Sequence, residues 1–406
     1  MERMRGAPGG LPSAERKPSW RQTRCVRRAS VMKRYKGIYF DHAATSYPKP
    51  RAVERAVLRA ISDEGGNPGR SGHTLSLRAA ERVFSARERI ADFFGLSDAR
   101  GVVFVKNATE ALNLAVSVFT QKGGHVLCDD MAHNALLRPL YALERTGKIT
   151  LSFFSAKEGV PDFKDNTLLL CATHASNICS HLIDAERLGA LCKERGVAFL
   201  LDASQSAGHF PVDCERIGAD AVCLPAHKGL YGIMGAGAVL FPHIRDDYPV
   251  FLSGGSGSHS LSREMPRALP EHFEAGTLPL PAIAAFEAGV NWVRGIGLDE
   301  IRHKIRSMEK RLWEGLGSMK NITLHGDGFG GGILSFTHAR LSPERVAAIL
   351  DDSGIAVRAG LHCAPLAHKT LGSGKEGTVR ISLGYTNTEK ECEHFLKEMQ
   401  NIAKNE

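Results

Sequence analysis

The chain has 406 residues, 43% hydrophobic and 24% charged, which fits a globular protein of two or three domains rather than a disordered chain. No apolar run approaches the roughly 20 residues of a membrane-spanning helix, and the 42 glycines show no triplet period, so membrane-spanning and collagen-like proteins are excluded. Nine cysteines are too dilute for a disulfide scaffold, and none forms a Cys-x-x-Cys pair. We therefore expect a reducing compartment, the cytoplasm, and no bound metal.

The net charge of +8 is concentrated near the N-terminus. Residues 1–31 contain eight Arg and Lys residues against Glu2 and Glu15, so six of the eight net charges lie there. The rest of the chain carries a net charge of only +2, which is too low for a typical nucleic-acid-binding protein. Binding of nucleic acid would therefore depend on residues 1–31 alone. Its Gly, Pro and Arg content without apolar periodicity predicts a disordered basic extension over residues 1–35. A transit peptide and a true start at Met32 are the alternatives.

From Ile38 onward, short apolar segments alternate with helical patterns. One helical face is expected to carry Val53, Ala56, Val57, Ala60 and Ile61. Helices are also predicted from Thr109, after His133 and from Asp184. Strands are predicted at Val102–Val105, His125–Cys128, Ile149–Phe154, Leu168–Ala172, Val197–Leu201, Val222–Leu224 and Gly235–Phe241. Continuous apolar strands that alternate with helices are typical of an α/β fold with a mostly parallel, doubly wound sheet.

A second, smaller α+β domain is predicted over residues 286–406, after a large domain over residues 36–285. A long amphipathic helix carries apolar residues at spacings of three and four, namely Leu298, Ile301, Ile305, Met308 and Leu312. The remaining elements are strands at Ile322–Leu324, Gly332–Phe336 and Val379–Leu383, a helix from Pro343, and a last helix that starts with a Thr388-x-x-Glu391 capping box.

Two polar residues follow neighbouring predicted strands, where ligands bind in such sheets. Asp202 follows the run VAFLL, and Lys228 follows AVCLPAH. Either residue alone is more often a turn former or a solvated side chain. Together they meet the needs of pyridoxal phosphate chemistry, in which a lysine amine binds the cofactor covalently and a carboxylate keeps its ring nitrogen protonated.

A series of motifs in fixed order extends this reading over nearly the whole chain. They read YFDHAATSYPKP, NPGRSGHTLS, VKNATEALNL, AHNALLRPL, HASNICS, LLDASQSAGH, AHKGLYG, FEAGT, VRAGLHCAPL and VRISLGYTN. On these motifs the chain resembles the cysteine desulfurases and selenocysteine lyases of the class-V aminotransferase group. The resemblance implies a fold-type I enzyme that depends on pyridoxal 5'-phosphate and works as a homodimer.

The resemblance also implies a role for each matching residue. Lys228 would hold the cofactor and later move the proton at the substrate Cα, Asp202 would pair with the ring nitrogen, and His133 would stack on the ring. Gln205 would donate to the ring oxygen, and Asn177 would reach that oxygen or the substrate carboxylate. The expected phosphate ligands are Ala108, Thr109 and His227 of the same subunit and Thr277 of the neighbouring one. The expected substrate-binding residues are Arg380, Arg358 and Asn177.

Cys363 is expected to determine the reaction. The other cysteines lie in apolar strands, helices or the basic extension, whereas Cys363 follows a glycine-containing loop with Arg358, His362 and His368 nearby. Basic neighbours would stabilise its thiolate. The resemblance then implies a desulfurase that converts L-cysteine to L-alanine and leaves a persulfide on Cys363 for an acceptor protein or a small thiol.

Three departures from the family pattern leave the subfamily and the sulfur acceptor open. Pro225 stands where a Ser or Thr phosphate donor is common, Ala132 where an acidic residue is common, and the segment after Gly276 lacks the usual Asn. A class-V aminotransferase, a selenocysteine lyase acting on L-selenocysteine, and a catalytically silent cofactor-binding protein are alternatives. An aminotransferase would keep Lys228 and Asp202 but would not need Cys363.

Overall fold

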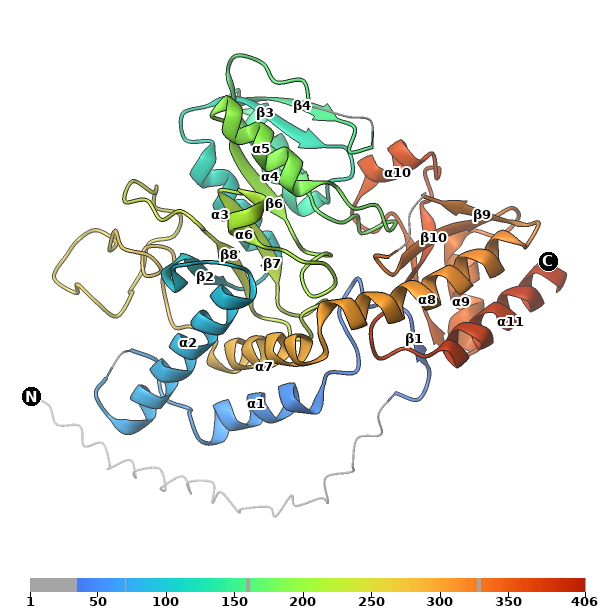
Figure 1. Ribbon diagram of the computed structural model, residues 1–406, viewed down its shortest axis with the longest axis horizontal. Helices are drawn as coiled ribbons and strands as arrows, with labels where there is room; N and C mark the ends of the chain where they lie inside the picture. Colours follow the sequence, from blue (N-terminus) through green and yellow to red (C-terminus); the bar gives the residue numbers. More distant parts are fainter. Residues whose placement is uncertain (1–34, 70, 158–160, 327–329, 406) are drawn as a thin grey trace, which may run out of the picture. The chain divides into compact units, whose positions relative to one another are not determined.

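A computed structural model describes residues 35–69, 71–157, 161–326 and 330–405 (Figure 1). The predicted disordered extension lies outside the described residues, apart from Tyr35. Residues Gly37–Glu406 form one unit, whose first strand, β1, spans Ile38–Tyr39. No helix among the described residues combines the length and the hydropathy needed to cross a bilayer.

The larger sheet has seven strands in the order β2-β8-β7-β6-β5-β3-β4. Only β8 runs antiparallel to its neighbours β2 and β7, and the remaining pairs are parallel. The link from β7 to β8 contains no helix to carry the chain back across the sheet, so β8 returns antiparallel. The predicted fold class is thereby confirmed. The strands are β2 (Val102–Val105), β3 (Gly124–Asp129), β4 (Ile149–Phe154), β5 (Thr167–Thr173), β6 (Ala198–Asp202), β7 (Ala221–Pro225) and β8 (Gly237–Leu240).

Helices cover both faces of this sheet because successive strand residues point to opposite sides. On one face, Leu169 and Leu200 pack with α3 (Ala108–Phe119) and α4 (Asn134–Arg145). On the other face, Leu170 and Leu201 pack in a second core to which five further helices of the described residues contribute. These helices are α1 (Arg51–Ser62), α2 (Thr74–Phe93), α5 (Ala185–Arg195), α6 (Cys214–Ile217) and α7 (Leu280–Ile296).

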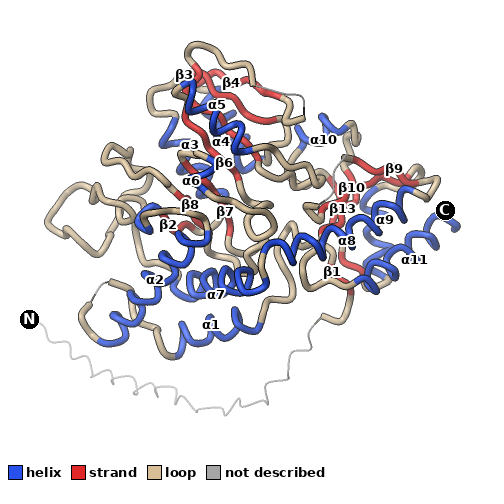
Figure 2. Tube along the Cα trace, viewed as in Figure 1, coloured by secondary structure: helices blue, strands red, loops and turns tan. Residues whose placement is uncertain are grey.

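A four-stranded antiparallel sheet, in the order β12-β13-β10-β9, forms the centre of the C-terminal part. Helices pack with it around a separate apolar core (Figure 2). β1 pairs in parallel with β11, so the start of the fold joins this part. The elements are α8 (Leu298–Gly317), β9 (Ile322–His325), β10 (Ile333–His338), α9 (Pro343–Asp352), β11 (Ile355–Ala356), β12 (Arg358–Gly360), α10 (Pro365–Leu371), β13 (Thr378–Ser382) and α11 (Glu389–Asn405). The division at 285/286 stays a prediction, and this position falls inside α7.

Local signals set several boundaries. The predicted capping box at the start of α11 is present, since Thr388 N donates to Glu391 Oε2 at 2.7 Å and Glu391 N donates to Thr388 Oγ1 at 3.3 Å.

The first predicted helix is α1 (Arg51–Ser62), but its apolar face differs from the prediction. Val53 and Ala60 are buried, whereas Ile61 is 62% exposed.

Candidate active site

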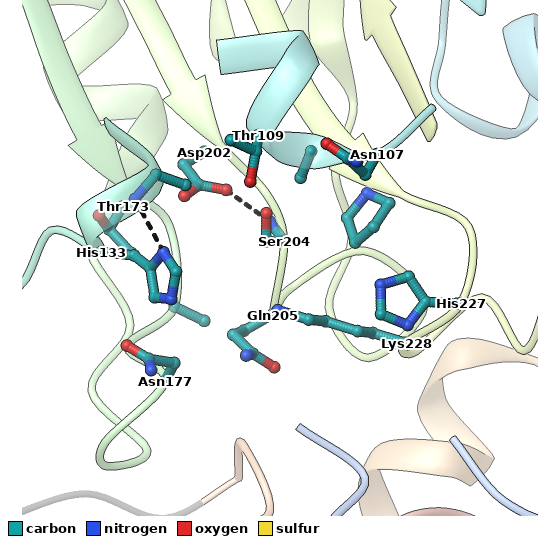
Figure 3. A pocket seen from close by; sticks show the side chains of 14 residues that line it. Asn107, Thr109, His133, Thr173, Asn177, Asp202, Ser204, Gln205, His227 and Lys228 are labelled. Carbon is teal, nitrogen blue, oxygen red and sulfur yellow. Dashed lines mark hydrogen bonds between the residues drawn. The ribbon is translucent and has the colours of Figure 1, made fainter. Parts of the chain in front are cut away.

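A cavity of about 550 Å³ opens where the carboxyl ends of β5, β6 and β7 meet the N-termini of α3 and α4 (Figure 3). Eight of the residues predicted for the cofactor site line it: Ala108, Thr109, His133, Asn177, Asp202, Gln205, His227 and Lys228. These residues come from five separate segments of the chain. The fold therefore brings together most of the predicted constellation.

Lys228 and Asp202 lie on the two strand ends that the sequence singled out. Asp202 ends β6, and its Oδ1 accepts a hydrogen bond from Ser204 N at 2.9 Å. Burial lowers the pKa of Lys228 to about 8, although the nearby Asp202 carboxylate acts in the opposite direction. About a tenth of Lys228 is therefore a neutral amine at pH 7, far more than the ordinary pKa of 10.5 would leave, and the neutral amine is the nucleophilic form.

His133 caps the N-terminus of α4 and lines the cavity. Its Nδ1 accepts the N–H of Ala135 at 3.0 Å, so the ring proton lies on Nε2. Burial lowers the pKa of His133 to about 4, and the positive charge of Lys228 adds to this shift. The ring is thus neutral at pH 7 and is suited to stacking. The neighbouring Ala132 has no side-chain group that could orient the His133 ring, so the hydrogen bond from Ala135 of the same helix orients it.

The N-terminus of α3 forms one wall of the cavity. Ala108 and Thr109 are its first two residues, and Asn107 caps the helix by accepting the N–H of Glu110 at 2.9 Å. Free N–H groups in the first turn and the Thr109 hydroxyl favour an anion at this place. Across the cavity, burial lowers the pKa of His227 to about 4.

Asn177 faces both the cavity and the loop that carries Cys363. Its Nδ2 donates to the carbonyl oxygen of His362 at 2.8 Å, whereas its buried Oδ1 has no hydrogen-bond partner among the described residues. Such an orphaned acceptor is costly unless a ligand satisfies it. Gln205 is also engaged, since its Nε2 donates to the carbonyl oxygen of Ala43 at 3.1 Å.

Arg380 lies in the middle of β13 and is 2% exposed. Its Nη2 donates to Asp41 Oδ1 at 2.8 Å and its Nη1 donates to the carbonyl oxygen of Asn177 at 3.0 Å, whereas its buried Nε has no hydrogen-bond partner in the described part of the chain. Burial lowers the pKa of Arg380, and Asp41 opposes this shift. A buried cation that keeps one free donor can still bind a carboxylate.

Cys363 is the one exposed cysteine among the described residues, and the other seven are buried. It lies outside the cavity wall, but its carbonyl oxygen accepts the N–H of Asn134, directly after the cavity residue His133, at 2.8 Å. Its charged setting differs from the prediction, because burial lowers the pKa of His362 to about 2 and that of His368 to about 4. Both histidines are neutral at pH 7.

The comparisons with known proteins agree with this geometry. The family model for class-V aminotransferases matches residues 38–395. The chain belongs to the class-V aminotransferase family. A probable cysteine desulfurase of Methanothermobacter thermautotrophicus is 32% identical over 90% of this chain and 94% of its own length, and one of Pyrococcus abyssi is 32% identical over the same shares. A solved cysteine desulfurase from Thermococcus onnurineus superposes with a TM-score of 0.82 at 30% identity, covering 91% of this chain and 95% of that chain.

Membership of this class-V family confirms the predicted enzyme class and its cofactor, pyridoxal 5'-phosphate. The cavity fits that group: it offers a poised lysine amine, a carboxylate for a ring nitrogen, a helix N-terminus for a phosphate and the orphaned Asn177 Oδ1. The amine, the carboxylate and the helix N-terminus each match one part of the cofactor, and Asn177 Oδ1 is left as an acceptor for a bound group.

Four of the predicted site residues do not line this cavity, namely Cys363, Arg380, Thr277 and Arg358. Thr277 is exposed and lines a separate hollow with Lys106 and Leu252. Arg358 is exposed on β12, opposite Arg380 in the strand register. Neither residue lines the cavity within one subunit.

Sequence reasoning missed several residues of the class-V site. Ser204 lines the cavity beside Thr109 (Figure 3), and its hydroxyl makes no hydrogen bond among the described residues, so it is a further donor there. Asp41, the partner of Arg380, was also missed. The strand-end rule could have found Thr173 at the end of β5, since the same rule found Asp202 at the end of β6. The other cavity residues that it missed are Asn107, Ala135 and Ala175.

Proposed function

We propose that the protein is a pyridoxal-phosphate-dependent cysteine desulfurase. L-Cysteine and the Cys363 thiol give L-alanine and a Cys363 persulfide. The observation that carries the proposal is the placement of Cys363, an exposed thiol bonded through its own carbonyl to the helix that positions His133 at the cofactor cavity. The relatives named cysteine desulfurases support it.

The proposed division of labour follows from the side chains. When bound, the cofactor withdraws electrons from the substrate Cα. Lys228, as a neutral amine, takes the Cα proton and returns it, while Asp202 holds the ring nitrogen and His133 covers the ring. Arg380 uses its free Nε to hold the substrate carboxylate. Ala108, Thr109, Ser204 and His227 hold the phosphate, and Gln205 and Asn177 contact the ring oxygen or the substrate.

Cys363 completes the reaction by attacking the substrate sulfur. A sulfur–sulfur bond forms, the carbon–sulfur bond breaks, and its electron pair with a proton goes to the carbon that becomes the methyl group of alanine. His362 and His368 are neutral at pH 7, so neither histidine supplies a positive charge beside Cys363. The persulfide then passes to an acceptor protein or a small thiol. The free thiols of all eight described cysteines are in keeping with a cytoplasmic location.

The direct test incubates the purified protein with L-cysteine and measures both alanine and protein-bound persulfide. We expect equal amounts of the two in the first turnover, with the persulfide on Cys363 by mass spectrometry. Transfer of the amino group to a keto acid without persulfide would instead support the aminotransferase alternative. Parallel assays with L-selenocysteine distinguish a selenocysteine lyase from a cysteine desulfurase.

The pH dependence of cofactor uptake is expected to follow Lys228. The covalent bond needs a neutral amine, and the pKa of Lys228 is lowered from 10.5 to about 8. Uptake by cofactor-free protein should therefore accelerate as pH rises through about 8, as followed by visible absorbance. Asp202→Asn removes the charge that raises this pKa, so its midpoint should lie lower. A wild-type midpoint near 10.5 would contradict the prediction.

The protein is further proposed to be a homodimer in which Thr277 reaches the phosphate of the neighbouring subunit. The support is that Thr277 is exposed and outside its own cavity. Light scattering should give the mass of a dimer. Thr277→Ala should weaken cofactor retention, but the variant should remain a dimer. A fully active monomer would refute the shared site.

A further inference from the structure

The loop of residues 361–364, called here the nucleophile loop, is fixed to the rest of the molecule through two consecutive backbone carbonyls. Asn134 N donates to the carbonyl oxygen of Cys363 at 2.8 Å. Asn177 Nδ2 donates to the carbonyl oxygen of His362 at 2.8 Å. Both donors belong to segments that also form the cofactor cavity, since His133 and Asn177 line it.

The backbone of this loop needs such support. His362 and Cys363 have φ angles of 49° and 57°, so two adjacent residues with side chains adopt the left-handed conformation that favours glycine. Residues remain in this region only where their surroundings hold them. Within the loop, Ala364 N donates to the carbonyl oxygen of Leu361 at 2.9 Å, and His362 Nε2 lies 3.2 Å from the carbonyl oxygen of Thr378.

Asn177 is the side chain that touches both the loop and the cavity. It is 5% exposed, and its carboxamide is divided between them: Nδ2 binds the loop, and Oδ1 has no partner among the described residues. Its backbone is held as well, because its carbonyl oxygen accepts a hydrogen bond from Arg380 Nη1 at 3.0 Å. Arg380 is in turn bonded to Asp41. Asn177 is therefore bonded through both its backbone carbonyl and its Nδ2, which leaves Oδ1 for the cavity.

We propose that Asn177 is a positioning residue that holds the nucleophile loop in its strained conformation and couples it to occupancy of the cofactor cavity. This inference rests on the proposed function, which makes Cys363 the nucleophile. A donor that engages Oδ1 in the cavity fixes the carboxamide and strengthens its hold on the loop. Without the Nδ2 donor, the loop relaxes and the Cys363 thiol becomes more accessible but less well aimed.

The test measures alkylation of Cys363 by iodoacetamide in the full-length, cofactor-loaded protein. A Cys25→Ser background leaves Cys363 as the exposed thiol, since the other described cysteines are buried. Asn177→Ala and Asn177→Asp should both react about tenfold faster, the scale of one lost neutral hydrogen bond. Aspartate keeps the shape but cannot donate, so an effect of volume alone would spare this variant.

Asn387→Asp is the matched control. Asn387 is also a buried amide whose Nδ2 donates to a backbone carbonyl, that of Tyr39 at 3.0 Å, but it belongs to no part of the cavity or the loop. This variant should alkylate at the wild-type rate. If it accelerates as much as the Asn177 variants, the effect is general loosening and the proposal fails.

Steady-state kinetics with L-cysteine give the second readout. The Asn177 variants should lose kcat by about tenfold with little change in KM, because loop placement acts after the substrate binds. A raised KM with unchanged alkylation would mean that Asn177 only binds substrate, and it would overturn the proposal. Alkylation needs no turnover, so failure of the desulfurase assignment would show separately, as absent persulfide in the wild-type protein.

Discussion

Replacing Lys228 with alanine is expected to abolish covalent attachment of the cofactor and to lower alanine formation by a factor on the order of 10⁴–10⁶, the scale seen when a central catalytic group is removed. Lys228 is the lysine whose amine lines the cavity and whose pKa burial lowers to about 8. Alanine supplies neither the bond to the cofactor nor a base for the Cα proton. The walls of the cavity remain, so the variant should still bind the cofactor through the phosphate end.

The measurement is reduction with borohydride followed by peptide mapping. Wild-type protein should carry the reduced cofactor on the peptide that contains Lys228, and Lys228→Ala should carry none. Lys310→Ala, at a lysine that is 67% exposed on α8, controls for effects on the fold. A cofactor adduct that persists in Lys228→Ala would show that another lysine binds the cofactor covalently, and it would contradict the assignment of Lys228.

The sheet could be predicted from the sequence because its signals are local. Apolar runs bounded by polar residues placed β2 and β4 at their observed ends, and the strand-end rule placed Asp202 at the cavity. The helix α7 escaped prediction because it is buried almost all round, so its sequence lacks an amphipathic period. The opposite error occurs in α1, where the apolar pattern predicts that Ile61 lies on the buried face, but the side chain is exposed.

The electrostatics and the long-range contacts of the site could not be predicted in this way. The sequence counts His362 and His368 as basic neighbours of Cys363, but burial makes both neutral, and burial is a property of the fold. The partner of Arg380 is Asp41, from the other end of the chain. The motif around Asn177 likewise gives no sign that its carboxamide holds the loop before Cys363.

Cys363→Ser is expected to separate cofactor chemistry from sulfur transfer. Lys228 and Asp202 remain in place, so the variant should bind L-cysteine and change the cofactor spectrum as the wild-type protein does. Alanine release should fall by a factor on the order of 10⁴–10⁶, because serine cannot act as the sulfur-accepting thiolate. Cys392→Ser is the control, since Cys392 is a buried thiol on α11 in the separate C-terminal core, and it should affect packing alone.

The outcome of this variant decides between the candidate reactions. With L-selenocysteine, the loss should be smaller, because selenium leaves carbon more readily and needs less help from a nucleophile. If Cys363→Ser releases alanine from L-cysteine at the wild-type rate, the exposed thiol is not the nucleophile and the desulfurase assignment fails. Transamination of a keto acid by both proteins would then make the class-V aminotransferase the better description, because that reaction needs Lys228 and Asp202 but no thiol.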